Sequence, residues 1–222
     1  MPKALIIGAG DGLSASLARL LAREGYAVAL AARNTAKLAA LAAEANATTH
    51  TCDAADAAQV AALFEAEGDA EVVVYNPSYR TRGPIAELDP AEVQKSLQVC
   101  AFGAFLAVRE AARRMLATGR GTILLTGASA GVKGYPLSAP FAMGKFALRG
   151  LAQSAARELH PQGVHVAHIV IDGGIRSTPR KDSGQDSLLD PDAIAASYLQ
   201  LIRQSRSAWS WELEIRPWVE SF

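Results

Sequence analysis

Short runs of apolar residues alternate with longer segments in which apolar residues recur every three or four positions. Residues 3–8 (KALIIG) and 26–32 (YAVALAA) are typical of strands buried on both faces. Between them, leucines recur at helical spacing from Leu13 to Leu21, and Gly25 is a stop signal. Buried strands that alternate with helices predict a parallel sheet covered by helices on each side, the doubly wound α/β design.

The same alternation continues through the 222 residues of the chain. Strands are expected at residues 3–8, 26–32, 48–52, 71–75, 121–127, 164–171 and 211–216. Helices are expected at residues 13–24, 35–45, 57–67, 90–117, 140–160 and 191–203. The polar segment 176–187 breaks the pattern and predicts a loop suited to closing over a substrate. Without a linker, repeat or low-complexity region, residues 1–222 are expected to form a single Rossmann-like domain with a parallel sheet of about seven strands.

Composition excludes several classes of protein. The 22 basic and 22 acidic residues cancel, and the absence of a basic block gives no electrostatic case for nucleic acid. The apolar runs fall far short of the ~20 residues that span a bilayer, so no membrane partner is expected. Cys52 and Cys100 have no metal-ligand spacing and cannot build a disulfide framework. A cytoplasmic location without a metal site is therefore expected.

A glycine-rich turn follows the first predicted strand. In GAGDGLSAS (8–16), Gly8, Gly10 and Gly12 allow a tight turn and a close approach of the backbone to a pyrophosphate. The amide groups and dipole of the next helix would then hold that anion. The spacing departs from the Gly-x-Gly-x-x-Gly pattern, because Leu13 occupies its last position. The segment is interpreted as a nucleotide-binding turn, with a plain strand-to-helix turn as the alternative.

The end of the second strand indicates which nucleotide is bound. NAD-binding sheets place an acid here, whereas this chain has Ala32, Arg33 and Asn34. Arg33 could form a charge-assisted contact with a 2′-phosphate, which favours NADP(H), with NAD(H) as the alternative. Asp11 argues the other way, since a carboxylate near the same ribose would repel a phosphate. Asp53, after the third strand, either accepts a hydrogen bond from the adenine amino group or caps a helix.

This layout resembles the short-chain dehydrogenase/reductase family over nearly the whole chain. The family opens with Thr-Gly-x-x-x-Gly-x-Gly, and the matching residues here are Ile7, Gly8, Gly12 and Ser14, so the first and last positions depart. Its Asn-Asn-Ala-Gly motif is similar to residues 75–78, in which Asn76 is kept.

The resemblance implies further cofactor contacts. Asp53 matches the family's adenine-contacting acid, and Asp172-Gly173 corresponds to its Pro-Gly after the sixth strand. Ser177 or Thr178 is similar to the hydroxyl residue that touches the nicotinamide carboxamide.

The resemblance also implies a catalytic site that departs from the family. Its Tyr-x-x-x-Lys helix is matched by Lys145, but Phe141 stands where the tyrosine should be. The family's lysine holds the nicotinamide ribose and lowers the tyrosine pKa, so that the tyrosine can exchange a proton with the substrate. The serine aligns with Ala128 and the helix asparagine with Cys100. Three of the four catalytic positions have therefore lost their usual chemistry.

Other residues could supply the missing proton. Tyr135 lies six residues before Phe141 in a loop that could roof the pocket, and the alternative is a packed loop aromatic. Ser129 and Ser138 offer hydroxyls nearby, and Ser138 could equally cap the helix. Cys100 is either a thiol acid or a small buried hydrophobe. A water is a further candidate donor.

Two functions remain from different classes. The first is an NADP(H)-dependent oxidoreductase that acts on a small carbonyl or alcohol, or on an activated enone, with a non-standard proton donor. The second is an NADP(H)-binding sensor or assembly protein without turnover. The loss of three catalytic positions favours the second function, whereas the retained lysine and the loop at 176–187 favour the enzyme, which is the function expected here. The resemblance also implies a homodimer or homotetramer assembled through the helices at 90–117 and 140–160.

Overall fold

The central feature of the computed structural model, which describes residues 1–177, 180, 182, 184 and 186–220, is a seven-stranded parallel sheet. The strand order is β3-β2-β1-β4-β5-β6-β7, and every neighbouring pair is parallel. The strands are β1 (Lys3–Ile7), β2 (Ala27–Ala32), β3 (Thr48–Thr51), β4 (Val72–Tyr75), β5 (Gly121–Thr126), β6 (Val164–Ile171) and β7 (Glu212–Ile215). The predicted doubly wound fold is confirmed, and each strand lies within two residues of its expected position.

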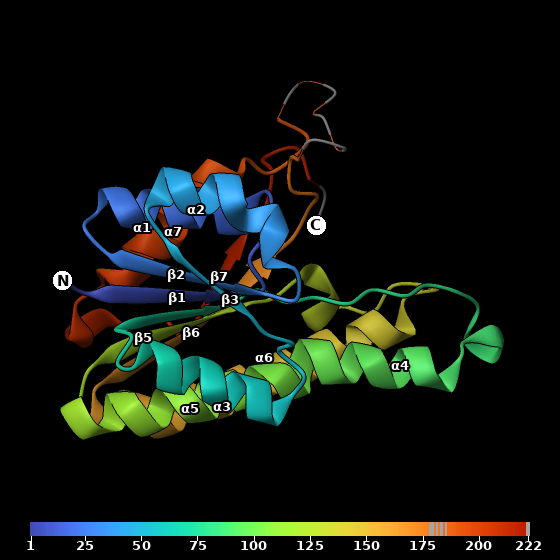
Figure 1. Ribbon diagram of the computed structural model, residues 1–222. Helices are drawn as coiled ribbons and strands as arrows, with labels where there is room; N and C mark the ends of the chain where they lie inside the picture. The colour runs from blue at the N-terminus through green and yellow to red at the C-terminus, as the bar shows by residue number, and fades with distance from the viewer. Residues whose placement is uncertain (178–179, 181, 183, 185, 221–222) are drawn as a thin grey trace.

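Helices cover both faces of the sheet (Figure 1). One face carries α1 (Leu13–Arg23), α2 (Ala39–Ala45) and α7 (Pro191–Ile202). The other face carries α3 (Ala57–Glu67), α4 (Pro90–Leu97), α5 (Gly103–Thr118) and α6 (Ala139–Leu159). α4 and α6 extend beyond the sheet on the side where the strands end, so they form one wall of the region in which parallel sheets bind ligands (Figure 1).

The alternation of side chains along β1 shows why the sheet needs two helical layers. Leu5 and Ile7 belong to the core beneath α3, α5 and α6, whereas Ala4 and Ile6 belong to the core beneath α1, α2 and α7. All four are at most 1% exposed. Because successive side chains of a strand point to opposite faces, an apolar strand of this kind is stable only when both faces are covered.

The helical segment predicted at 90–117 is continuous but not uniform. Between α4 and α5 lies a π-helical turn (Gln98–Phe102). The buried Tyr75, at the end of β4, donates a hydrogen bond from Oη to the carbonyl of Val99 at 2.6 Å within this turn. At Gly103 a side chain would meet that phenol, because a Cβ placed there would lie 2.3 Å from Tyr75 Oη. The irregular turn therefore follows from packing that the apolar pattern does not encode.

A matched pair of glycines in α6 tests this close packing of helices. A Cβ at Gly144 would lie 2.8 Å from Cys100 Cβ and 3.1 Å from Ser96 O, whereas a Cβ at the exposed Gly150 meets nothing within 4 Å. Gly144→Ala is expected to lower the free energy of unfolding by about 1–3 kcal/mol through overpacking. Gly150→Ala should raise it by about 0.5–1 kcal/mol, because alanine favours a helix.

Urea denaturation of both variants measures this difference. Equal effects of the two substitutions would contradict the close contact between α6 and the π-helical turn.

Candidate functional site

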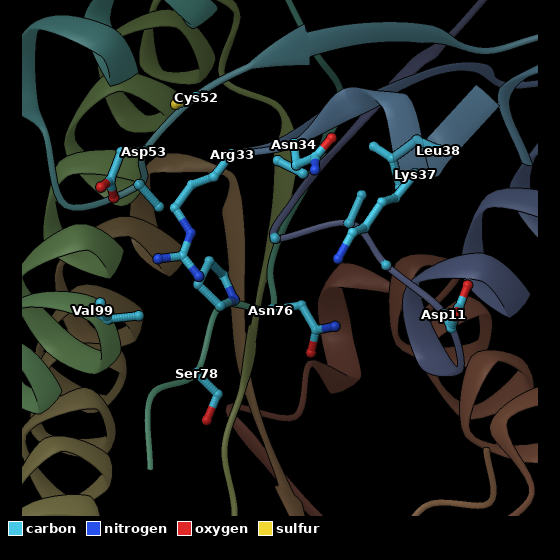
Figure 2. A pocket seen from close by; sticks show the side chains of 16 residues that line it. Asp11, Arg33, Asn34, Lys37, Leu38, Cys52, Asp53, Asn76, Ser78 and Val99 are labelled. Carbon is cyan, nitrogen blue, oxygen red and sulfur yellow. The ribbon is translucent and has the colours of Figure 1, made fainter. Parts of the chain in front are cut away.

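A cleft of about 470 Å³ opens at the carboxyl ends of β1, β2, β3 and β4 (Figure 2). It lies beside the point where the strand order reverses, between β1 and β4, which is where open α/β sheets bind ligands. Residues from the segments after these four strands line it, joined by Val99 of the π-helical turn. They are Gly8, Ala9, Gly10, Asp11, Arg33, Asn34, Lys37, Leu38, Cys52, Asp53, Ala54, Asn76, Pro77, Ser78 and Val99, together with Ala32 at the end of β2.

The glycine turn has the geometry that an anion-binding turn requires. Gly8 has φ +80°, and a Cβ there would lie 2.6 Å from the backbone nitrogen of Pro77, so no larger residue fits. Gly10 has open space where a side chain would stand. Gly12 precedes α1 with φ +81° and offers no side chain to cap its first amide groups. These amides and the helix dipole are therefore available to a phosphate group.

Asn76 joins the loop after β4 to the glycine turn. Its backbone nitrogen donates to the carbonyl of Ile7 at 2.9 Å, and its Nδ2 donates to Ser14 Oγ at 2.7 Å. Ser14 Oγ in turn donates to the carbonyl of Gly8 at 3.2 Å. The sequence predicted Asn76 as a cofactor-binding residue, and the structure places it in the cleft wall as a support of the turn.

Two cations reach into the cleft from the segment that follows β2. Arg33 and Lys37 are exposed, and Figure 2 shows both side chains extending into the cleft above Asn76. Asn34 has a local role, because its Oδ1 accepts a hydrogen bond from Ala36 N at 3.1 Å and caps the following 3-10 turn. Lys37 was not predicted, although its position one helical turn after Arg33 could have indicated it.

The two carboxylates of the cleft are placed differently. Asp53 Oδ1 accepts from Ala55 N at 3.0 Å, and the residue that caps α3 is Asp56. The helix-cap interpretation of Asp53 is therefore wrong. The alternative, a cleft residue, agrees with its place in the wall. Asp11 lies on the border between the cleft and a second hollow.

The second hollow, of about 390 Å³, adjoins the cleft where the N-terminus of α1 faces the segment after β6. Its lining comprises Asp11, Gly12, Leu13, Asn76, Ile175, Arg176, Ser177 and Arg180. The structure thus brings the predicted residues Leu13 and Ser177 to the site, while Thr178 lies outside the described residues. Gly173 is not in this wall, since a Cβ there would lie 2.8 Å from Pro217 Cδ.

Lys145, in α6, is buried with 2% of its surface exposed. Its side chain reaches the end of β5. Its Nζ donates to the carbonyl of Thr126 at 2.8 Å. Burial lowers the pKa of Lys145 to about 8, and the positive charge of Arg80 acts in the same direction. A buried lysine is costly unless it has a polar partner. The carbonyl of Thr126 uses one of its three donors, so the ammonium group can bind a further oxygen.

The side chains next to Lys145 are apolar. Phe141, Cys100 and Ala130 form a small buried cluster, against which Ala128 packs. The Phe141 ring centroid lies 5.8 Å from Lys145 Nζ. Phe141, Ala128 and Cys100, which the resemblance aligns with three catalytic positions, thus pack together in one apolar cluster.

The hydroxyl residues considered as substitute proton donors make contacts with residues other than Lys145. Tyr135 is 41% exposed, and Lys133 Nζ lies 5.7 Å from its ring centroid. Ser129 begins a 3-10 turn, where its carbonyl accepts from Lys133 N at 3.0 Å. Ser138 occupies the N-cap position of α6 without a side-chain cap hydrogen bond. Among the hydrogen bonds of the described residues, none joins these hydroxyls to Lys145.

Residues 2–187 match the short chain dehydrogenase family, and the chain belongs to it. It is 32% identical to trans-4-hydroxycyclohexanecarboxylate dehydrogenase of Sinomonas cyclohexanicum, over 73% of this chain and 68% of that protein. It is 30% identical to L-2,3-butanediol dehydrogenase of Corynebacterium glutamicum, over 72% and 67%.

Solved structures agree with this assignment. A short-chain dehydrogenase from Rhodopseudomonas palustris superimposes with a TM-score of 0.87 at 37% identity, covering 98% of this chain and 99% of its own. A metagenomic short-chain oxidoreductase in complex with NADP gives 0.85 at 29% identity and 97% coverage of each chain. The chain is therefore an oxidoreductase-family member whose structural relatives bind a nicotinamide cofactor.

Two further features are absent from the part of the chain that the structure describes. No helix there combines the length and apolar character needed to cross a bilayer. No group of three or more His, Cys, Asp or Glu side chains among the described residues is arranged to hold a metal ion.

The burial of Lys145 leads to a prediction about the stability of the folded protein. Lys145→Met should raise the free energy of unfolding of the cofactor-free protein at pH 7 by roughly 1–3 kcal/mol, because no ammonium group is then desolvated. The folded pKa of about 8 lies below the unfolded value of 10.5, so the unfolded chain binds more protons between these values. The advantage of the variant is therefore full below pH 8 and fades as pH rises toward 10.5.

Urea denaturation at pH 7, 8.5 and 10 measures this trend. Lys37→Met, at an exposed lysine, is the control and should show no such trend. A pH-independent gain for Lys145→Met would contradict the prediction.

Proposed function

We propose that the chain is an NADP(H)-dependent oxidoreductase that interconverts a small carbonyl compound and its alcohol, or reduces an activated enone. The observation that carries the proposal is the order in which the binding groups lie along one edge of the sheet. Arg33 and Lys37 follow β2, the glycine turn follows β1, and the buried Lys145 lies behind the end of β5. The activities named for the two curated relatives, on a hydroxycyclohexanecarboxylate and a butanediol, support an alcohol or carbonyl substrate.

When bound, the cofactor supplies or accepts a hydride. The chain's own residues suit its parts. Gly8, Gly10 and Gly12 and the N-terminus of α1 would hold the pyrophosphate, and Asp53 the adenine. Arg33 and Lys37 would hold a 2′-phosphate, which supports NADP(H) over NAD(H). Lys145 would bind the nicotinamide ribose, and either Ser177, which lines the second hollow, or Thr178 would bind the carboxamide.

The catalytic part of the proposal is that three positions lack the family's usual groups. Phe141, Ala128 and Cys100 occupy the places of its tyrosine, serine and asparagine, and together they form an apolar surface. Because no hydroxyl of Ser129 or Tyr135 is bonded to Lys145, we propose a water as the proton donor. A substrate that needs little help from an acid, such as an activated carbonyl or an enone, suits this site.

We also propose that the chain forms a homodimer or homotetramer. Aromatic side chains on α5 and α6 are exposed, notably Phe105 (46%) and Phe146 (44%). Pairing of these helices with a second copy would cover them.

Cofactor preference tests the binding half of the proposal. NADPH should bind more tightly than NADH, and Arg33→Ala or Lys37→Ala should each reduce NADPH affinity by about ten- to a hundredfold, the value of a charge-assisted contact. NADH affinity should hardly change. Fluorescence titration of both nucleotides against each protein measures these constants, with Arg23→Ala, an exposed arginine outside the cleft, as control. Equal affinities for NADPH and NADH in the unmutated protein would refute the preference.

Restoring a hydroxyl tests the catalytic half. Phe141→Tyr should increase the rate of reduction of a simple activated ketone, by less than the 10²–10⁴-fold typical of acid catalysis, because Ala128 and Cys100 leave other hydrogen bonds unmade. Adding Ala128→Ser should raise the rate more than additively. Adding Lys145→Ala should cancel the gain, because the new phenol would lose the neighbouring charge that lowers its pKa.

Steady-state rates of NADPH consumption over a panel of carbonyl compounds separate the functional hypotheses. NADPH binding without turnover in every variant would exclude the oxidoreductase and leave the non-catalytic nucleotide-binding protein.

A further inference from the structure

A second cation lies beside the ring of Phe141. Arg80, in the loop after β4, places its Cζ 4.3 Å from the ring centroid. Lys145 Nζ lies 5.8 Å from the same centroid. One apolar ring is therefore flanked by two cations, of which Lys145 is buried and Arg80 is open to solvent. The guanidinium and ammonium groups thus both lie within 6 Å of the centre of the Phe141 ring.

The loop that carries Arg80 is fixed by the residue before it. Tyr79 N donates to Cys100 Sγ at 3.4 Å, and Tyr79 O accepts from Ser96 Oγ at 3.2 Å. The Tyr79 phenol also donates to Glu92. These contacts come from α4 and the π-helical turn, so the backbone at Arg80 is held on the same elements that enclose Phe141. The guanidinium position follows from this anchoring and from its stacking on the ring.

The surroundings of Arg80 are positively charged. Partial burial lowers its pKa, and the nearby charges of Arg82 and Arg180 lower it further. Within the described part of the chain, none of these three arginines forms an ion pair with a carboxylate. Arg180 also lines the hollow that adjoins the cofactor cleft. Like charges gathered without a counter-ion favour the binding of an anion.

We propose that Arg80 is a substrate-binding residue that receives a carboxylate, so that the substrate is a small oxo acid or the corresponding hydroxy acid. The planar guanidinium fork matches a carboxylate through two parallel hydrogen bonds, and Arg82 and Arg180 add to the attraction. Arginine does not lose its proton in proteins, so Arg80 binds the substrate and leaves the proton donor unchanged. The carbonyl part of this inference rests on the proposed function, whereas carboxylate binding does not.

The test compares acids with neutral analogues of the same shape. The probes are acetoacetate and 2-oxobutanoate, each with its methyl ester, added to the protein saturated with NADPH. Binding is measured by isothermal titration with a non-reducible analogue of each, the hydroxy acid and its methyl ester, and turnover is measured as KM and kcat for the oxo compounds. The variants are Arg80→Gln, Arg80→Lys and, as a charge-matched control, Arg157→Gln at an exposed arginine near the end of α6.

Arg80→Gln should weaken binding of at least one acid by about ten- to a hundredfold and leave its ester unchanged. Arg80→Lys should retain part of the affinity, and Arg157→Gln all of it. NADPH affinity should stay constant in every variant. Where turnover occurs, the effect should appear in KM more than in kcat.

Equal affinities for acid and ester in the unmutated protein, or a loss in Arg80→Gln that is the same for both, would overturn the inference. Acid binding that depends on Arg80 but without turnover would support the carboxylate site and count against the oxidoreductase. Turnover of the esters that does not depend on Arg80, without Arg80-dependent binding of the acids, would support the oxidoreductase and count against the carboxylate site.

Discussion

Burial of the central strands on both faces is the constraint on which the rest of the structure depends. The core side chains of β1 and β2 are all apolar, and β4 adds only the phenol of Tyr75 at its end. The polar groups that bind a ligand therefore lie where the strands end and the backbone turns away from the sheet. The close contact of Gly8 with Pro77 joins the ends of β1 and β4, and Asn76 and Ser14 bond across the same junction. The cleft is the direct result, since its walls are the residues that follow the strands.

The second physical theme is the cost of a buried ammonium group. Lys145 lies beside the ring of Phe141, and its ammonium group donates a hydrogen bond to the carbonyl of Thr126. A site that keeps such a group gives up stability in exchange for an oxygen-binding donor at a fixed place. A purely structural residue at this position of α6 would be apolar, like Leu148 one turn later.

The fold was predictable from the sequence because its signals are local. Apolar runs and helical spacing located the strands and helices, and the glycines identified the turn. Lys145 stood out because charge rarely occurs within an apolar helix. The family resemblance also singled out Phe141, Ala128 and Cys100, which pack together in the structure.

What the sequence did not reveal depends on the paths of loops and on packing. Whether Asp53 or Asp56 caps α3 depends on the path of the backbone between these two residues. The π-helical turn accepts a hydrogen bond from the phenol of Tyr75, which is 24 residues from Val99. Lys37 enters the cleft only because a 3-10 turn precedes α2. In the sequence Arg80 resembles any loop arginine, and its role depends on the loop folding back on Cys100.

The departures at Phe141 and Cys100 have a common physical consequence. The sulfur of Cys100 accepts the backbone N–H of Tyr79, and the face of Phe141 receives the guanidinium of Arg80. A phenol in place of Phe141 would bring a hydrogen-bonding group, with its own demand for partners, into a cluster that now contains only carbon and sulfur side chains. Phe141 and Cys100 therefore act together: Cys100 holds the loop that carries Arg80, and Phe141 holds its positive charge against an apolar ring. In the function that we propose, such a site would place its substrate by electrostatic attraction and would leave the proton to the solvent.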